Sequence, residues 1–471
     1  MGKIVNSYIL PHPPIIVPEI GQDREEVAAA AETIRAVKRA AQEIALDNPT
    51  TIILSSPHAP CFKDFVYITN SEDLFGDFRS FGEPKLEFHF KNNSELVAGI
   101  IKKAELAGIN AGTLGSRIKE EYGIPDMLDH GALVPLYFIR KETGNFKLVI
   151  ISTPFMPLID LYRFGKCIAE AVKSSAENVV YVASGDLSHR LTVDAPAGYN
   201  PQGREYDQYL IAKIKEAAVE DLLNIDENRM ETAGECGTRS FIMMLGALDG
   251  LKLETDIFSY EGPFGVGYLV AKVGGFAKDK ENDFLDNYWC NQKKGLNTIR
   301  QNESDLVRLA RQTLETFVKE KRKINIPEGL SSDLSNKRAG VFVSIKKNGQ
   351  LRGCIGTIGP TRKNIAEEVI NNAISSGTQD PRFKPVSEAE LAELVYSVDV
   401  LGEPEKINSI QELDVNRYGV IVTSGLRRGL LLPDLEGVET PEQQVAISLQ
   451  KAGIGNSEKF ELERFEVIRY K

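Results

Sequence analysis

Cysteine, histidine and tryptophan are scarce in this chain of 471 residues, which has five cysteines, five histidines and one tryptophan. The cysteines are odd in number and widely spaced, and no two of them form a Cys-x-x-Cys pair. We therefore expect neither a disulfide framework nor a zinc site built from thiolates. A reducing compartment fits this composition. The five are Cys61, Cys167, Cys236, Cys290 and Cys354.

The chain also lacks an excess of positive charge and lacks long apolar runs. Its 56 basic and 67 acidic residues give a formal net charge of −11, so no overall basic field attracts nucleic acid or anionic lipid. No run approaches the ~20 apolar residues of a membrane span, and residues 1–7 enter a short β-like run rather than a signal core. We expect a cytoplasmic protein that binds small molecules or proteins, without nucleic-acid or membrane partners.

The length and texture of the chain indicate two domains. A chain of this size is long for one hydrophobic core, and up to residue 273 β-like runs alternate with helical stretches. This alternation predicts an α/β domain with a mostly parallel central sheet flanked by helices, in which residues 208–223 form one helix. The Gly274-Gly275 pair and the polar stretch after it predict a linker over residues 274–300. Ser304 is a candidate N-cap, and residues 301–471 are predicted to form a smaller α+β domain.

Three of the five histidines follow short apolar runs that read as strands. His12 stands in Pro11-His12-Pro13-Pro14, His58 in Ser56-Pro57-His58-Ala59, and His189 in Gly185-Asp186-Leu187-Ser188-His189. In a parallel sheet, residues just beyond the carboxyl ends of the strands meet in one crevice. We therefore expect these side chains to converge.

A carboxylate for the same site is available in Gly234-Glu235-Cys236-Gly237, which opens a later helical stretch. Two neutral imidazoles and one carboxylate form the facial triad that suits non-haem Fe(II). The metal ligands we predict are His12, His58 and Glu235.

These motifs, together with Asp129-His130-Gly131, resemble the class III extradiol ring-cleaving dioxygenases, or LigB-like proteins, and their Memo-like relatives over residues 1–273. The resemblance implies a site in which a catechol chelates Fe(II) and dioxygen takes the remaining position. It places ligands on His12 and His58, with Glu235 as the carboxylate. It also implies that His189 takes a catechol proton and that His130 is a second acid/base group.

Two assignments stay open at this site. Memo-like relatives have a cysteine as the third ligand, and here Glu235 and Cys236 are adjacent. A thiolate would favour copper or zinc, whereas a carboxylate favours Fe(II); both cannot easily point inward, and we favour Glu235. Asp186 either orients His189 or is a simple turn residue. We assign no role to His89.

The C-terminal part, from about Ser304 to the end, resembles the AMMECR family. The matching segments are Leu351-Arg352-Gly353-Cys354-Ile355-Gly356-Thr357, Asp380-Pro381-Arg382-Phe383, Ser397-Val398-Asp399-Val400-Leu401 and Gly429-Leu430-Leu431-Leu432-Pro433. Arg352 is placed to lower the pKa of the Cys354 thiol, which would make that cysteine a nucleophile or sensor. The alternative is a buried structural cysteine.

The same segment is expected to form a β-hairpin. Asn348-Gly349 is a strong two-residue turn signal between residues 341–347 and 350–358. A turn of this type would pair Ser344 with Gly353 and Val343 with Cys354.

The presence of both domains on one chain resembles the AmmeMemoRadiSam system protein A family, which is named for its co-occurrence with a Memo-like protein and a radical-SAM enzyme. That resemblance implies such partners, acting on a shared small molecule or protein.

We expect a non-haem Fe(II)-dependent oxidoreductase with a small-molecule, catechol-like substrate. The alternatives are a non-catalytic metal-binding or scaffold protein and metal-assisted hydrolysis. The acid/base pair His189 and His130 favours the enzyme. The open assignment of the third ligand to Glu235 or Cys236, and the implied partner proteins, favour the scaffold.

Overall fold

The computed structural model describes residues 1–21, 25–125, 127–278, 283–347, 349–435, 437–455 and 458–471. The chain forms two compact units, residues 1–289 and 290–471, each with its own buried apolar clusters. The segment expected to be a linker contains the end of strand β10 (Tyr268–Lys278) and helix α12 (Phe284–Gln301). Within the described ranges, no helix is long and apolar enough to cross a membrane.

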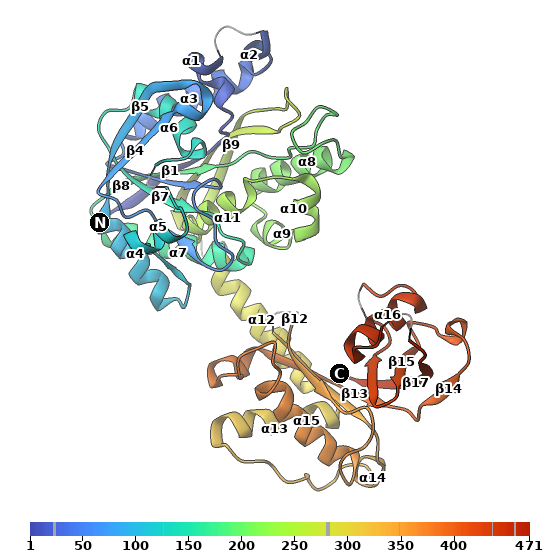
Figure 1. The fold of residues 1–471 in the computed structure, drawn as a ribbon. Coiled ribbons are helices and arrows are strands. Elements are labelled where there is room, and N and C mark those ends of the chain that lie inside the picture. The colour runs from blue at the N-terminus through green and yellow to red at the C-terminus, as the bar shows by residue number, and fades with distance from the viewer. Residues whose placement is uncertain (22–24, 126, 279–282, 348, 436, 456–457) are drawn as a thin grey trace. The chain divides into compact units, whose positions relative to one another are not determined.

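The N-terminal unit is built on an eight-stranded mixed sheet (Figure 1). Its five central strands, from β5 to β1, are parallel, and antiparallel pairs complete both edges. The predicted mostly parallel centre is confirmed, and the full sheet is mixed. In spatial order the strands are β4 (Asp73–Phe78), β5 (Glu83–Asn92), β7 (Lys147–Ser152), β2 (Thr51–Ser56), β8 (Asn178–Ser184), β1 (Lys3–Leu10), β10 and β9 (Leu251–Glu261).

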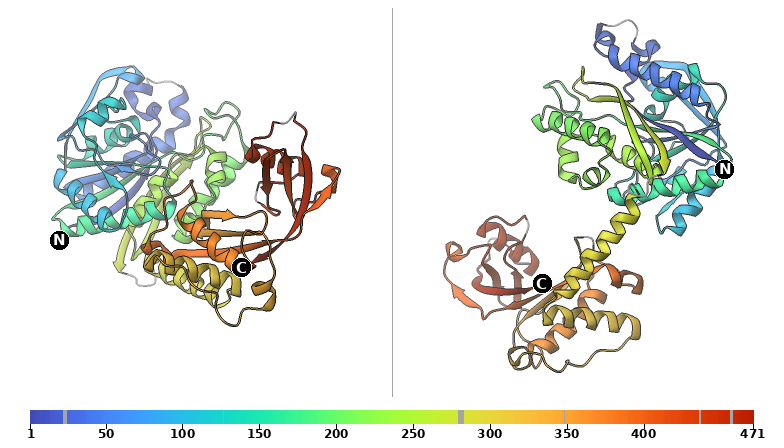
Figure 2. Two further views of the ribbon diagram at one scale, coloured as in Figure 1. Left: turned by 60° about the horizontal axis from the view of Figure 1, so that its bottom comes forward. Right: turned by 180° about the vertical axis from the view of Figure 1, so that it is seen from behind.

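Helices cover both faces of this sheet (Figure 2). Helices α3 (Ala31–Asp47) and α6 (His130–Glu142) pack on one face, and α4 (Ser94–Leu106), α7 (Leu158–Ser174) and α11 (Thr238–Ala247) on the other. Along β1 the buried residues alternate between the two cores, since Tyr8 and Leu10 belong to one cluster and Ile9 belongs to the other. Because the central strands are parallel, their carboxyl ends lie on the same side of the sheet.

The predicted single helix over residues 208–223 is wrong. The chain instead forms α8 (Pro201–Lys215) and α9 (Val219–Leu223), because Ala217 between them takes a left-handed φ of 53° that ends the first helix. The remaining elements of this unit are short: α1 (Pro18–Gly21), α2 (Glu25–Ala29), α5 (Ser116–Glu121), α10 (Glu227–Ala233), β3 (Val66–Tyr67), β6 (Ala111–Gly112) and two 3₁₀ turns, Pro14–Ile16 and Arg79–Phe81.

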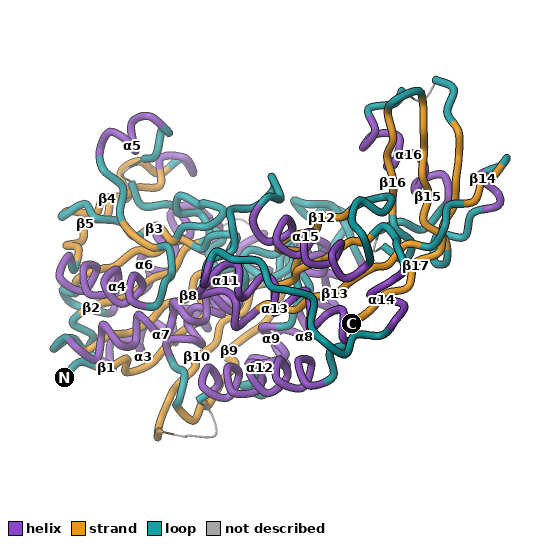
Figure 3. Tube along the Cα trace, turned by 90° about the horizontal axis from the view of Figure 1, so that it is seen from below, coloured by secondary structure: helices purple, strands orange, loops and turns teal. Residues whose placement is uncertain are grey.

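The C-terminal unit is a curled antiparallel sheet with helices, which confirms the predicted α+β class (Figure 3). Helices α13 (Asp305–Glu320) and α15 (Ile365–Thr378) cover one face of its first strands. The predicted start is confirmed, since Ser304 is the N-cap of α13. The other elements are α14 (Ser332–Asn336), α16 (Pro441–Ala452), β11 (Val341–Lys347), β12 (Gln350–Gly356), β13 (Leu394–Leu401), β14 (Glu405–Ile407), β15 (Tyr418–Ser424), β16 (Arg427–Leu431), β17 (Glu461–Tyr470) and the 3₁₀ segments Glu388–Glu393 and Ile410–Glu412.

The hairpin of β11 and β12 forms, but its predicted register is wrong by one residue. Ser344 pairs with Cys354 and Val343 with Ile355, because a bulge lies between Ile345 and Lys346. A shift of one residue exchanges the faces of a strand, so Cys354 lies on the face of Ser344 rather than on that of Val343. Asn348 of the predicted turn lies outside the described residues.

The close packing of helices α7 and α11 can be tested by substitution. A Cβ atom at Gly246 would lie 2.0 Å from the carbonyl oxygen of Tyr162. We expect Gly246→Ala to destabilise the N-terminal domain by about 1–3 kcal/mol, as overpacked core sites do, and to lower its melting temperature. Gly144→Ala is the control, because a Cβ there meets nothing within 4 Å. Equal melting temperatures for the two variants would contradict the close packing.

Candidate metal centre

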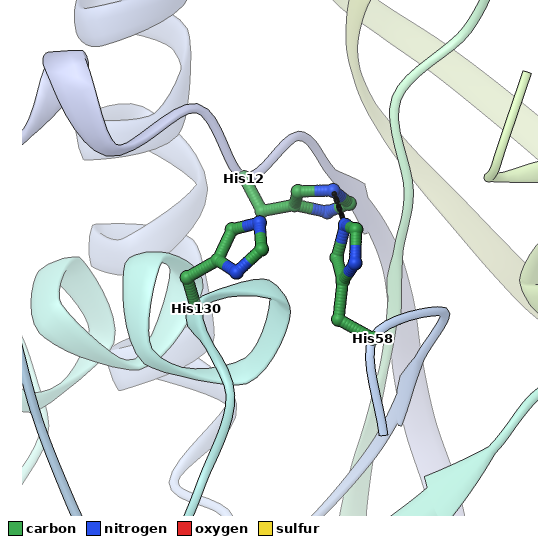
Figure 4. Close-up of side chains that lie close together, drawn as sticks. All are labelled: His12, His58 and His130. Atoms are coloured by element: carbon green, nitrogen blue, oxygen red, sulfur yellow. Dashed lines mark hydrogen bonds between the residues drawn. The ribbon is translucent and has the colours of Figure 1, made fainter. Parts of the chain in front are cut away.

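Three histidines converge at the carboxyl edge of the N-terminal sheet (Figure 4). His12 follows β1, His58 follows β2, and His130 is the first residue of α6. One ring nitrogen from each lies within 4.8 Å of those of the other two. The geometry expected from the crevice rule brings His12 and His58 together, and it adds His130, which the sequence indicated only as an acid/base group.

The closest approach in this cluster joins His12 and His58. Their Nε2 atoms are 3.0 Å apart. Two imidazole nitrogens bound at right angles to one ion, at about 2.1 Å each, would lie roughly 3.0 Å apart. Without an ion, a single N–H···N hydrogen bond gives the same spacing. The spacing of the two nitrogens therefore matches that of two ligands on one first-row metal ion.

Burial keeps both imidazoles neutral, which is the form that binds metals. Desolvation lowers the pKa of His12 well below its usual value, and it lowers the pKa of His58 to about 4. The neighbouring His130 lowers the pKa of both further, because two adjacent cations repel. At neutral pH the cluster therefore offers lone pairs rather than positive charge.

The two candidates for the third ligand, Glu235 and Cys236, have different contacts in this structure. The Glu235 carboxylate accepts hydrogen bonds from the backbone N–H and the hydroxyl of Thr238, at 2.7 and 2.6 Å. It thus satisfies the first turn of α11, whose N–H groups have no partner within the helix. The Cys236 sulfur instead lies 3.7 Å from His12 Nε2. Of the two adjacent candidates, Cys236 is therefore the one whose side chain contacts His12.

Two glycines allow this cysteine to reach the site. A Cβ atom at Gly185 would lie 2.2 Å from the Cα of Gly237, so the turn carrying Cys236 touches the backbone directly after β8. The backbone N–H groups of Cys236 and Gly237 both donate to the carbonyl oxygen of Asp186. The turn is therefore fixed against the strand end that precedes His189.

Asp186 has a larger role in this structure than either sequence interpretation gave it. Its Oδ1 accepts the backbone N–H of His12 at 3.0 Å, and its Oδ2 lies 3.6 Å from His12 Nε2. Burial raises the pKa of this carboxyl to about 7. In the described structure its side chain contacts His12 rather than His189, so it holds the loop that carries His12 in place. Because Gly-Asp-Leu-Ser has the composition of an ordinary turn, this role of Asp186 could not be predicted from the sequence pattern.

The two predicted acid/base residues lie beside the ligands. Burial lowers the pKa of both His130 and His189, so both are neutral at pH 7. The His130 ring packs 4.1 Å from that of His58 and 5.5 Å from that of Phe81. His189 Nδ1 is buried and has no hydrogen-bond partner among the residues that the structure describes. The neutral imidazole is the form that can accept a proton.

In the C-terminal unit, the predicted pairing of Arg352 with Cys354 is not found. The Arg352 guanidinium binds the Glu390 carboxylate through two hydrogen bonds, of 2.9 and 3.2 Å. The cation beside the cysteine is Arg382, which donates to the Cys354 carbonyl oxygen at 3.3 Å and is held by Asp380. Burial raises the pKa of the Cys354 thiol, which favours the structural interpretation of this cysteine.

Comparison with known proteins agrees with both parts of this description. The family model described as the catalytic LigB subunit of aromatic ring-opening dioxygenase matches residues 6–271, and the AMMECR1 model matches residues 307–471. The chain therefore belongs to the LigB family, whose members are generally metal-dependent. More particularly, it belongs to the proteins in which a LigB domain is fused to a C-terminal AMMECR1 domain, as the two resemblances predicted.

Relatives are known for the whole chain and for part of it. A protein of Clostridium acetobutylicum is 42% identical over 465 residues, which cover 98% of each chain. A protein of Thermotoga maritima is 48% identical over 171 residues, which are 36% of this chain and 98% of that protein. The solved structure of an uncharacterised protein from Pyrococcus horikoshii is 34% identical, covers 35% of this chain and 88% of its own, and has a TM-score of 0.33.

The two adjacent third-ligand candidates can be separated by substitution. We expect Cys236→Ala to weaken binding of a first-row metal ion, because it removes the donor that faces His12. Glu235→Gln should leave the metal affinity nearly unchanged and lower the melting temperature, since the carboxylate caps α11; loss of a cap costs about 1 kcal/mol. Titration with Zn(II) and thermal denaturation measure the two effects. Loss of metal affinity in Glu235→Gln alone would restore the carboxylate as ligand.

The cysteines of the C-terminal unit also give a measurable contrast. Cys290 is exposed, whereas Cys354 is partly buried and has a raised thiol pKa. Because the thiolate is the reactive form, we expect an alkylating reagent at neutral pH to modify Cys290 before Cys354. Mass spectrometry of timed samples measures the order. Faster labelling of Cys354 would show an activated thiol.

Proposed function

We propose that the N-terminal domain holds a redox-active first-row metal ion on His12, His58 and Cys236 and acts as an oxidoreductase. The observation that carries this proposal is the convergence on His12 Nε2, which has the His58 nitrogen at 3.0 Å and the Cys236 sulfur at 3.7 Å. The three donors come from three separate elements. Membership of the LigB family also supports a metal-dependent activity for this domain.

The donor set bears on the choice of metal. Two imidazoles with a carboxylate suit Fe(II), and replacing the carboxylate by a thiolate moves the preference toward copper or zinc. Among these ions, iron and copper support redox chemistry. When bound, the ion would polarise a chelating oxygen ligand and supply the redox centre. The relationship to the LigB family supports Fe(II), which we propose as the metal, and the thiol makes copper its competitor.

The residues around the ligands suit a substrate that loses protons as it binds. The neutral imidazoles of His130 and His189 can each accept a proton from a hydroxyl group. The ring of Phe81 packs on the edge of His130 and gives the site an apolar wall. A small aromatic molecule with two adjacent hydroxyl groups, as in a catechol, combines these requirements. We propose this substrate class.

A second candidate function is a non-catalytic, Memo-like metal-binding protein. The position of Cys236 near His12 favours it, because Memo-like relatives have a cysteine as the third ligand. From the domain combination, we also propose that a radical-SAM enzyme and a Memo-like protein act with this chain on a shared molecule. Both candidates require the same metal site.

The two functions are separated by metal analysis and turnover. The full chain is purified anaerobically, its metal content is measured, and a catechol is titrated while absorbance is followed. We expect iron or copper at one ion per chain, and catechol-dependent consumption of dioxygen. Zinc in the site, or a bound redox metal without turnover, would favour the non-catalytic protein.

The proton-accepting role is tested with His189→Ala. We expect this variant to keep its metal and to lose about 10²- to 10⁴-fold in turnover, the usual loss when a general base is removed. His89→Ala is the matched control, because His89 lies on β5 with its side chain 69% exposed. If His189→Ala folds but loses its metal, His189 is a ligand and the assigned role is wrong.

A further inference from the structure

Ser184, the last residue of β8, connects one metal ligand to a neighbouring helix. Its side chain is fully buried. Its Oγ lies 3.0 Å from His12 Nδ1 and 2.6 Å from the carbonyl oxygen of Gly131, in the first turn of α6. A hydroxyl has one hydrogen to donate, whereas a carbonyl oxygen can only accept. The serine hydrogen must therefore point to Gly131.

This arrangement decides which nitrogen of His12 carries a hydrogen. Since the Ser184 hydrogen is committed to Gly131, its oxygen is left to accept a hydrogen bond from His12 Nδ1–H. A neutral imidazole has only one N–H, so Nε2 is left with a free lone pair. This nitrogen lies 3.0 Å from His58 Nε2, 3.6 Å from Asp186 Oδ2 and 3.7 Å from Cys236 Sγ.

We propose that Ser184 is a positioning residue that holds His12 in the Nδ1–H tautomer and so keeps its Nε2 open for a metal ion. The inference rests on the proposed metal site for its consequence but not for its first test. The other tautomer would place a hydrogen at the coordinating position. Partners that orient the second nitrogen of a ligating histidine typically change metal affinity by 10- to 100-fold when removed.

A second chain of hydrogen bonds ties His58 to the same helix start. The Ser56 hydroxyl donates to Asp129 Oδ1 at 2.6 Å, and the backbone N–H of His58 donates to Ser56 Oγ. Asp129 in turn caps α6. The first turn of α6 therefore orients the His12 ring through Ser184 and holds the loop that carries His58 through Asp129.

The tautomer of His12 can be read without any metal. The full chain is labelled with ¹⁵N-histidine, and long-range ¹H–¹⁵N spectra are recorded; His12→Ala assigns the signal among only five histidines. We expect protonated Nδ1 and unprotonated Nε2 in the wild type. In Ser184→Ala, we expect Nε2 protonation to appear. A wild-type His12 protonated at Nε2, or an unchanged tautomer in Ser184→Ala, would overturn the inference.

Metal affinity is the second measurement. Zn(II) competition should show a 10- to 100-fold weaker site in Ser184→Ala. Ser55→Ala is the matched control, because Ser55 is equally buried next to the last residue of β2 and its Oγ forms a hydrogen bond with Ser240 Oγ. Equal affinities in the two variants would contradict the proposed role.

If Ser184→Ala does not fold, Ser184→Thr is the second variant. It retains the hydroxyl and should retain the wild-type tautomer, and loss of that tautomer would count against the proposal. Absence of any metal binding in the wild type would refute the proposed function and leave the tautomer result standing.

Discussion

The first turn of α6 is the part of the N-terminal domain on which the candidate site depends. Asp129 caps this helix through the N–H of Ala132 and receives the Ser56 hydroxyl. Gly131 has no side chain because a Cβ there would lie 2.5 Å from Ser56 Oγ and 3.2 Å from the His58 ring. The helix start is therefore in van der Waals contact with the ligand loop. Its polar groups are satisfied by the same residues that orient the imidazoles, so helix capping and site geometry are one network.

Desolvation determines the charge state of this network. The buried imidazoles have lowered pKa values, whereas burial raises those of the Asp186 carboxyl and the Cys236 thiol. Both shifts favour the neutral form of each group. A divalent cation reverses this preference for the acidic groups, since coordination deprotonates a thiol. An interior that disfavours isolated charges would thus accept a cation together with the anionic donors that balance it.

The strands and the convergence of His12 and His58 could be predicted from sequence, because they depend on local pattern. The apolar runs before His12 and His58 predict strands, and the crevice rule places their ends together. The placement of the two third-ligand candidates could not be predicted this way, because Glu235 and Cys236 are adjacent and only the folded structure directs the Glu235 carboxylate to Thr238.

Other differences from the sequence-based predictions arise from backbone geometry and long-range contacts that the sequence pattern does not encode. A left-handed residue at Ala217 divides a helical stretch that looks continuous. A bulge after Ile345 moves Cys354 to the other face of its hairpin. The connection from His12 through Ser184 to Gly131 joins three distant segments, and no sequence spacing marks it.

The contact between Gly185 and Gly237 has a consequence for the evolution of this site. The backbone approach at this point sets how far the turn of residues 234–237 reaches toward His12. Because a carboxylate and a thiol occupy adjacent positions in that turn, a slip of one residue would exchange a hard donor for a soft one while the sheet and both histidines stayed in place. Insertion or deletion of a single residue in this turn is therefore a route by which such a domain could change its metal without changing its fold.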